Sequence, residues 1–253
     1  MIKRIKETSE KRIALLIDGD NARPSLIGKI LTEAGKYGSV TIRRIYGDWT
    51  TSNMQGWKSS LNNAAIQPIQ QFRYTVGKNA TDSAMIIDAM DILNSNLVDG
   101  FCLVSSDSDY TRLATRIREK GIFVMGIGKK TTPKAFINAC NLFIYTENLA
   151  PKTTVKRKKS ETRTKTVPGK TKSLDPVPLL KGAFDMALQE DGWASLATMG
   201  FYLHQLDPSF DPRTYGYKQL SQLIKSNSQL FEIKFKEEEG ATHFYVRLKE
   251  KAE

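Results

Sequence analysis

The sequence predicts an α/β domain with a mainly parallel sheet, followed by a linker and a small winged-helix domain. Three observations predict this organisation. Short β-rich runs alternate with helical stretches over residues 1–149, the apolar periodicity stops over residues 150–178, and residues 179–253 change to short helical stretches followed by a hairpin. Strands that alternate with amphipathic helices favour a parallel sheet with helices on both of its faces.

The first domain contains six runs with strand character and three clear amphipathic stretches. The predicted strands span residues 13–17, 40–46, 66–72, 101–104, 123–126 and 142–145. The predicted helices span residues 26–37, 82–93 and 110–120, where apolar side chains recur at helical spacing.

The middle segment, residues 150–178, is rich in Lys, Thr, Pro, Ser and Gly, and it carries 9 Lys and Arg over residues 151–178 against 2 Asp and Glu. Such a composition cannot bury enough apolar surface to offset the entropy lost on ordering the chain. We therefore expect a flexible basic linker. A basic tether can also hold phosphate groups without sequence preference.

The last segment, residues 179–253, is expected to hold helices over residues 179–189, 196–206 and 217–226. Two alternating runs follow, with a turn expected over residues 237–241. The residues expected to share one face in each run are Phe231, Ile233 and Phe235, and then Phe244, Val246 and Leu248. Three helices and a hairpin are the outline of a winged helix.

Composition and charge restrict the class of protein. The chain of 253 residues is 40% hydrophobic and carries a net charge of +11, which suggests a polyanionic partner. Residues 1–150 carry 20 basic against 14 acidic side chains, whereas residues 179–253 carry 9 against 11, so the basic excess lies outside the last segment. The two cysteines fall in a predicted strand and a predicted helical segment, and no apolar run approaches the roughly 20 residues of a membrane span, so we expect a cytoplasmic protein without membrane insertion.

Two predicted strands run directly into acidic motifs. The first ends in Asp18-Gly19-Asp20-Asn21, and the second is followed by Ser105-Ser106-Asp107-Ser108-Asp109. An aspartate after a strand is often only the N-cap of the next helix, so neither motif is specific alone. Because the carboxyl ends of parallel strands meet at one edge of the sheet, the two motifs together predict an acidic crevice there.

A further carboxylate comes from the helix predicted over residues 82–93. At about 100° per residue, Asp82 lies on the apolar face that must pack on the sheet, at the end nearest the crevice. Asp88 and Asp91 fall on the other side and are expected to be solvated, although the shape of the crevice could bring Asp88 close.

Several carboxylates in one crevice repel one another unless a cation lies between them. Mg²⁺ suits this arrangement best, because it needs only one or two direct carboxylates together with waters and substrate phosphate oxygens, and Mn²⁺ is the near alternative. Cys and His do not cluster in the sequence, so zinc is not expected. A divalent ion there could activate a water molecule and stabilise charge on a phosphate.

Basic and aromatic side chains offer candidate contacts to nucleic acid. Lys78, Lys129 and Lys130 lie near the predicted crevice, and an ordinary surface role competes with phosphate binding for each. The third helical stretch of the last segment offers only Lys218 and Lys225, so reading of duplex DNA is not expected. The candidates for stacking on unpaired bases are Tyr215, Tyr217 and His243, whereas Trp193 and most Phe residues are expected in the core.

Residues from about 13 to 149 resemble the NYN domains, which are relatives of the PIN nucleases. The resemblance lies in the two acidic motifs and the segment 78–88, and the motif order is kept. It implies a PIN-like Rossmannoid fold and metal-dependent cleavage of RNA. It also implies metal-binding and catalytic roles for Asp18, Asp82, Asp107 and Asp109, with Asp20, Asn21, Ser105 and Asp88 as neighbours of the site. Ser106 departs from the pattern, because glycine is frequent there in the family.

The segment from about residue 179 to 249 looks like a LOTUS domain, also called OST-HTH. The residues that carry this resemblance are Gly192-Trp193-Ala194, Phe210-Asp211-Pro212-Arg213 and Tyr215-Gly216-Tyr217, with the hairpin over residues 231–248. The resemblance implies binding of RNA, sometimes G-rich, or docking of a protein partner.

Three function classes fit parts of this sequence. Asp18-Gly19-Asp20 after a strand also fits a phosphatase of the haloacid-dehalogenase type, but that class needs a distal acidic pair, and no aspartate occurs between Asp109 and Asp175. A non-catalytic RNA-binding or scaffold protein is the second alternative. The favoured interpretation is a metal-dependent ribonuclease, expected to be an endonuclease, that acts on single-stranded RNA with help from the C-terminal domain.

Overall fold

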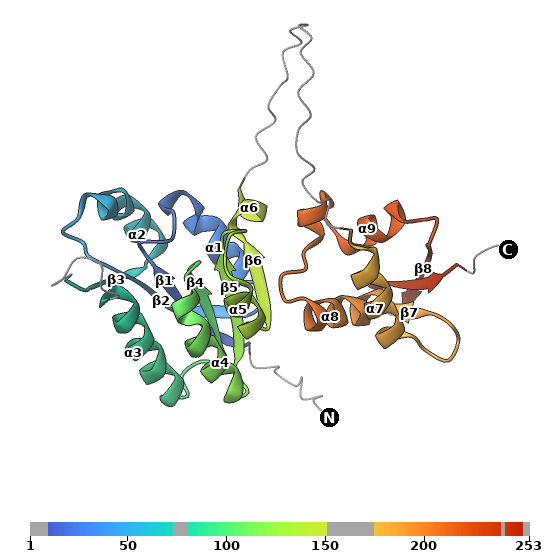
Figure 1. Cartoon of the computed structure of the whole chain (residues 1–253), viewed down its shortest axis with the longest axis horizontal. Coiled ribbons are helices and arrows are strands. Elements are labelled where there is room, and N and C mark those ends of the chain that lie inside the picture. The colour runs from blue at the N-terminus through green and yellow to red at the C-terminus, as the bar shows by residue number, and fades with distance from the viewer. Residues whose placement is uncertain (1–9, 73–79, 151–174, 239–240, 250–253) are drawn as a thin grey trace, which may run out of the picture. The chain divides into compact units, whose positions relative to one another are not determined.

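The computed structural model describes residues 10–72, 80–150, 175–238 and 241–249. The chain forms two compact units, Met1–Leu149 and Ala150–Glu253 (Figure 1). Of the expected linker, residues 151–174 lie outside the described residues. Among the residues that are described, no helix is both long enough and apolar enough to span a bilayer.

The first unit is built on a six-stranded sheet with the order β3-β2-β1-β4-β5-β6, in which every neighbouring pair is parallel. The strands are β1 (Arg12–Asp18), β2 (Ser39–Gly47), β3 (Gln67–Gln70), β4 (Gly100–Val104), β5 (Phe123–Gly128) and β6 (Leu142–Tyr145). All six predicted strands are present, and the predicted α/β class with a parallel sheet is confirmed. The central pair β1 and β4 carries the two acidic motifs at its carboxyl end.

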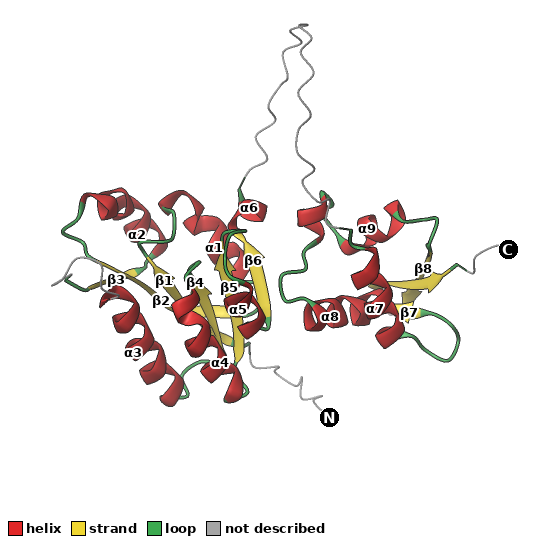
Figure 2. Ribbon diagram, in the orientation of Figure 1, coloured by secondary structure: helices red, strands yellow, loops and turns green. Residues whose placement is uncertain are grey.

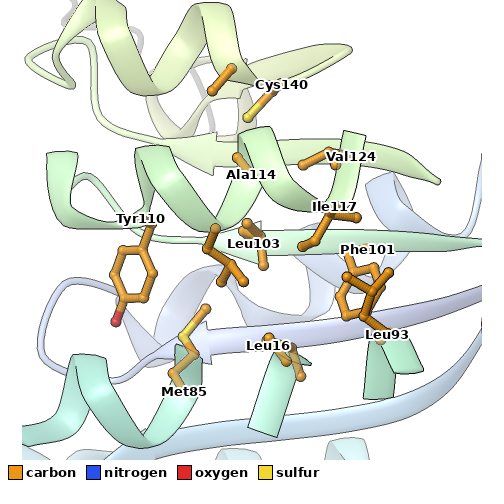
Figure 3. Packing of buried hydrophobic residues seen from close by; sticks show 14 of the residues in the cluster. Leu16, Met85, Leu93, Phe101, Leu103, Tyr110, Ala114, Ile117, Val124 and Cys140 are labelled. Atoms are coloured by element: carbon orange, nitrogen blue, oxygen red, sulfur yellow. The ribbon is translucent and has the colours of Figure 1, made fainter. Parts of the chain in front are cut away.

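Helices cover both faces of this sheet, as predicted (Figure 2). They are α1 (Ile27–Ala34), α2 (Lys58–Ala64), α3 (Ala80–Asn94), α4 (Thr111–Glu119), α5 (Lys134–Ala139) and α6 (Thr146–Leu149). Along β1, Leu15 and Ile17 join the core beneath α1 and α2, whereas Ala14 and Leu16 join the core beneath α3, α4 and α5. Figure 3 shows the core beneath α3, α4 and α5, in which Leu16, Leu103 and Val124 of the strands pack among helix side chains.

Some elements differ from the prediction. The 3-10 segment Ser52–Trp57 and the helices α2, α5 and α6 were not predicted, because each is too short to display a helical period. The strand expected over residues 66–72 is shortened to β3, which lies at the edge of the sheet and contains Pro68, a residue that cannot donate a ladder hydrogen bond.

The second unit has the winged-helix outline that the sequence predicted. Its elements are α7 (Val177–Ala187), β7 (Ala194–Ser195), α8 (Leu196–Leu206), α9 (Leu220–Ser226), β8 (Phe231–Glu238) and β9 (Ala241–Leu248). The strands form an antiparallel sheet of order β7-β9-β8. Its core is formed by residues that include Leu180, Phe184, Met199, Leu203, Phe210, Ile224, Phe231 and Val246.

Three boundaries in the second unit depart from expectation. Helix α7 begins at Val177, inside the segment assigned to the linker, with Pro178 in its first turn where proline is tolerated. Helix α9 begins at Leu220 rather than at residue 217, because a 3-10 turn (Pro212–Tyr215) ends at Gly216 with φ of 94°. The hairpin strands extend into the expected turn, and residues 239–240 lie outside the described residues. Phe235, expected on the apolar face, is 66% exposed.

Candidate metal centre

Asp18 is the last residue of β1 and is almost completely buried, with 1% of its surface exposed. Its Oδ1 accepts a hydrogen bond of 3.1 Å from the backbone N–H of Asp20. Its Oδ2 accepts from Asn21 Nδ2 at 2.7 Å and from Ser105 Oγ at 2.8 Å. The carboxylate is therefore held in one orientation by groups from both acidic motifs.

Ser105 and Asp107 continue this network after β4. The backbone N–H of Asp107 donates to Ser105 Oγ at 3.1 Å, so the hydroxyl links the loops that follow β1 and β4. Asp107 also caps the 3-10 turn Ser108–Tyr110 by accepting from the backbone N–H of Asp109 at 2.9 Å. The N-cap role and a ligand role are thus compatible, because the second carboxylate oxygen of Asp107 remains available.

Asp82, Asp107 and Asp109 converge on one place. Each offers a carboxylate oxygen, and these oxygens all lie within 4.8 Å of one another. Asp82 lies in the first turn of α3, and its Oδ1 accepts from the hydroxyl of Tyr110 at 2.7 Å. Tyr110 is fully buried in the core shown in Figure 3, so the helix carrying Asp82 is tied to the turn carrying Asp109.

The electrostatics of the cluster oppose full ionisation. Burial raises the pKa of Asp18, hydrogen bonds from Asn21 and Ser105 lower it, and the charges of Asp82 and Asp20 raise it further. Burial likewise raises the pKa of Asp82; the Tyr110 hydrogen bond lowers it, and the charges of Asp107 and Asp109 add to the rise. A cation between the carboxylates would relieve this repulsion, and the all-oxygen donor set suits a hard divalent ion.

Replacing Asp82 by asparagine is expected to stabilise the metal-free protein in a pH-dependent manner. The pKa of Asp82 is raised in the native state, so the native state binds the carboxyl proton more tightly than the unfolded state does. The free energy of unfolding of the wild type therefore falls as pH rises through the raised pKa and the buried carboxyl ionises. Asp82→Asn should therefore match the wild type below about pH 4 and exceed its Tm by a few degrees at pH 7. Thermal melts in EDTA measure this difference, with Asp91→Asn on the exposed side of α3 as control. A Tm difference that does not vary with pH would contradict the prediction.

Asp88 does not lie in the cluster and is not solvated as expected. Its carboxylate accepts hydrogen bonds from the Tyr46 hydroxyl and from Arg44 Nη1, both on β2. Arg44 and Tyr46 are two residues apart and so face the same side of the sheet, against which α3 packs. Arg44 was the sequence signal for this contact. A cation on the strand face that a helix covers needs an acidic partner on that helix, and Asp88 is that partner. Asp91 is exposed, as expected.

Of the three lysines expected near the crevice, the structure describes Lys129 and Lys130. Lys78 lies outside the described residues. Lys129 is half-buried and Lys130 is exposed in the loop after β5. The backbone N–H of Lys129 donates to Ser106 Oγ at 2.9 Å, so Ser106 joins this loop to the acidic motif. The backbone N–H of Lys130 donates to the carboxylate of Glu147 at 3.0 Å.

The candidate RNA-binding residues of the second unit divide into two groups. Tyr215 and Tyr217 are half-buried and pack against the core, with the ring of Tyr215 centred 5.8 Å from that of Phe210. Lys218 and His243 are exposed.

Trp193, which was expected in the core, is only half-buried on the outer face of the three-stranded sheet. Lys234 Nζ lies 3.6 Å from the centre of its ring, and the Arg247 guanidinium lies 4.8 Å from it. Lys234 and Lys236 also lie 5.8 and 5.9 Å from the ring of Tyr245. Glu232 lies on the same face and accepts a hydrogen bond from Arg247 Nη2 at 2.7 Å. This basic and aromatic face, formed by Trp193, Lys234, Lys236, Tyr245 and Arg247, was missed, although lysines alternating with apolar residues in β8 signal it.

Comparison with known proteins identifies both units. The NYN domain family matches residues 12–148, and the chain belongs to this family. An OST-HTH/LOTUS domain matches residues 171–240. At the family level NYN domains are generally RNases, and NYN and LOTUS domains both imply RNA binding, so both units point to an RNA-related function.

Three similar proteins are themselves described as uncharacterised or of unknown function. An uncharacterised protein of Methanocaldococcus jannaschii is 29% identical over 127 residues, which cover 49% of this chain and 50% of the relative. The chain thus spans about half the length of this curated relative. A Vibrio parahaemolyticus protein of unknown function is similar at 19% identity and a TM-score of 0.46, over 55% of this chain and 94% of its own. An uncharacterised Nitrosomonas europaea protein is 32% identical over 38% of this chain and 93% of its own, with a TM-score of 0.29.

Proposed function

We propose that the protein is a metal-dependent ribonuclease that cleaves single-stranded RNA at the carboxyl edge of the six-stranded sheet. The observation that carries this proposal is the convergence of Asp82, Asp107 and Asp109 within 4.8 Å, on the strand ends and helix of an NYN domain. Asp18 is not one of these three, but Ser105 links its buried carboxylate to them, because the Ser105 hydroxyl donates to Asp18 Oδ2 and accepts from the backbone N–H of Asp107. The four aspartates are assigned as the catalytic and metal-binding residues.

Mg²⁺ is the assigned ion, with Mn²⁺ as the alternative, because the donors are all carboxylate oxygens. A bound divalent ion lowers the pKa of a water molecule and neutralises charge that develops on the phosphate. The protein's own contribution is to orient the ligands. Asn21 and Ser105 fix the Asp18 carboxylate, and Tyr110 fixes that of Asp82, so the ligands are arranged before the ion binds.

RNA is held by groups outside the aspartate cluster. The loop carrying Lys129 and Lys130 is joined to the acidic motif through Ser106, which puts positive charge near the proposed scissile phosphate. The LOTUS unit adds affinity for unpaired strands, G-rich ones among them, through the basic and aromatic face, since bases stack on aromatic rings and lysines bind phosphates. Cys102 and Cys140 are both free and buried thiols, and free thiols suit a reducing cytoplasm. Burial raises the pKa of Cys140 to about 12.

A cleavage assay on defined oligonucleotides tests the proposal. Purified protein with Mg²⁺ or Mn²⁺ is expected to cut a single-stranded RNA that is labelled at both ends, to leave the same DNA sequence intact, and to be inactive in EDTA. Internal products that appear before any mononucleotide indicate endonuclease action, which we expect. Binding of RNA without cleavage under every metal condition would leave the protein as a non-catalytic RNA-binding protein and refute the nuclease assignment.

A further inference from the structure

A pocket of about 520 Å³ lies between the edge strand β3, the helix α2 and the loop that follows β2. Its volume falls in the range of about 300–1,000 Å³ that is typical of small-ligand sites. The lining follows β3 from Ile66 to Gln70 and includes Trp49, which comes after the carboxyl end of β2, at the edge of the sheet that carries the aspartates. The lining residues are Trp49, Met54, Gln55, Lys58, Leu61, Asn62, Ile66, Pro68 and Gln70.

Trp49 is held firmly at the rim of this pocket. Its backbone N–H donates to Gln70 Oε1 and its Nε1 donates to the carbonyl of Ile69, both at 3.0 Å. The Gln70 side chain is fixed in turn, because its Nε2 donates to Asp48 Oδ1 at 3.0 Å. A fixed aromatic ring gives a stacking surface with little loss of side-chain entropy on binding.

Met54 connects the pocket to the turn that follows Asp18. Met54, which is 2% exposed, packs so closely on Gly19 that a Cβ at that position would meet Met54 Cε at 2.5 Å. Gly19 directly follows Asp18. Strand β3 lies two strands from β1 and three from β4, which corresponds to about 10 and about 14 Å at the usual strand spacing. A strand of nucleic acid covers these distances in about three to four stacked nucleotides or fewer extended ones.

The polar groups of the pocket suit a nucleotide. Gln55, Lys58 and Asn62 are exposed, and their side chains make no hydrogen bond within the described part of the chain. Amide side chains pair with the edges of bases, and a lysine adds charge for a neighbouring phosphate. The lining includes one cation and no carboxylate, so the pocket is electrostatically compatible with RNA, in contrast to the aspartate cluster.

We infer that this pocket binds one unpaired nucleobase of the RNA whose phosphodiester bond lies at the aspartates. The inference rests on the proposed ribonuclease function and names its specificity-determining site. Trp49 stacks on the base, Gln55 and Asn62 contact its edge, and Lys58 contacts the adjoining phosphate. Such a pocket makes cleavage depend on the identity of a base a few nucleotides from the cut, although the aspartates contact only the backbone.

The test compares a double variant, Gln55→Ala with Asn62→Ala, against Asn63→Ala in the full-length protein. Asn63 is exposed on the same helix but does not line the pocket, so it controls for changes on the surface of α2. Libraries of single-stranded RNA with one varied position measure base preference. The double variant should raise KM for the preferred RNA about 10-fold with little change in kcat, and should flatten the base preference.

Fluorescence anisotropy in EDTA measures RNA affinity without cleavage, which separates the two proposals. If the wild type does not cleave RNA but the double variant weakens binding about 10-fold, the pocket assignment stands and the nuclease assignment falls. If the wild type cleaves RNA and the double variant keeps the KM and base preference of Asn63→Ala, the pocket assignment is overturned. That result would also be expected if the pocket accepted a side chain of a partner protein.

Discussion

Asp107→Asn is expected to reduce the rate of RNA cleavage by at least about 100-fold while leaving RNA affinity in EDTA unchanged. Asp107 lies in the group of three carboxylates and comes from the loop that also supplies Asp109. Asparagine keeps the oxygen that accepts the hydrogen bond from the backbone of Asp109, so the turn should persist. What is lost is one negative charge that the metal ion requires.

The matched control is Asp99→Asn, which makes the same chemical change just before β4, at the opposite edge of the sheet. Asp99 is paired with Arg12 there and is remote from the cluster. Single-turnover cleavage with Mg²⁺, together with isothermal titration of Mn²⁺, measures both the rate and the ion affinity. Cleavage by Asp107→Asn at the wild-type rate, or cleavage by the wild type that persists in EDTA, would contradict the mechanism.

The sheet and the position of the aspartates were predictable because both follow from local patterns. Strands buried on both faces read as continuous apolar runs, as in Leu15, Leu16 and Ile17, and the residue after such a run must lie at the sheet edge. The phase of the helix placed Asp82 inward, and the structure has it hydrogen-bonded to Tyr110. Local periodicity is therefore sufficient to predict the direction of a side chain wherever a single helix or strand fixes that direction.

The supporting contacts were not predictable, because they join segments far apart in the sequence. Ser105 was expected beside the site, but nothing near it in the sequence indicates that its hydroxyl binds Asp18, 87 residues away. The partnership of Asp88 with Arg44 depends on how α3 lies across β2, which the helical phase does not specify. Trp193 was assigned to the core from its apolar character alone, whereas two cations from β8 and β9 lie over its ring.

Removal of residues 151–253 is expected to raise KM for single-stranded RNA about 10-fold or more while changing kcat little. The aspartates all lie in the compact unit Met1–Leu149, so the chemical step should not depend on the remainder. The removed part includes the basic segment, with 9 Lys and Arg over residues 151–178 against 2 Asp and Glu, and the basic and aromatic face of the LOTUS unit. Each phosphate contact that is lost also lowers the dependence of binding on salt.

The slope of log Kd against log salt concentration, measured in EDTA, distinguishes the linker from the LOTUS sheet. In the full-length protein, Trp193→Ala with Arg247→Ala should weaken binding through lost stacking and at most about one phosphate contact, so the salt slope changes by about one unit or less. The truncation should flatten the slope further, because it removes the linker charges as well. If neither change alters RNA affinity, substrate binding depends on the NYN unit, and the result points to the LOTUS unit as a protein-docking module.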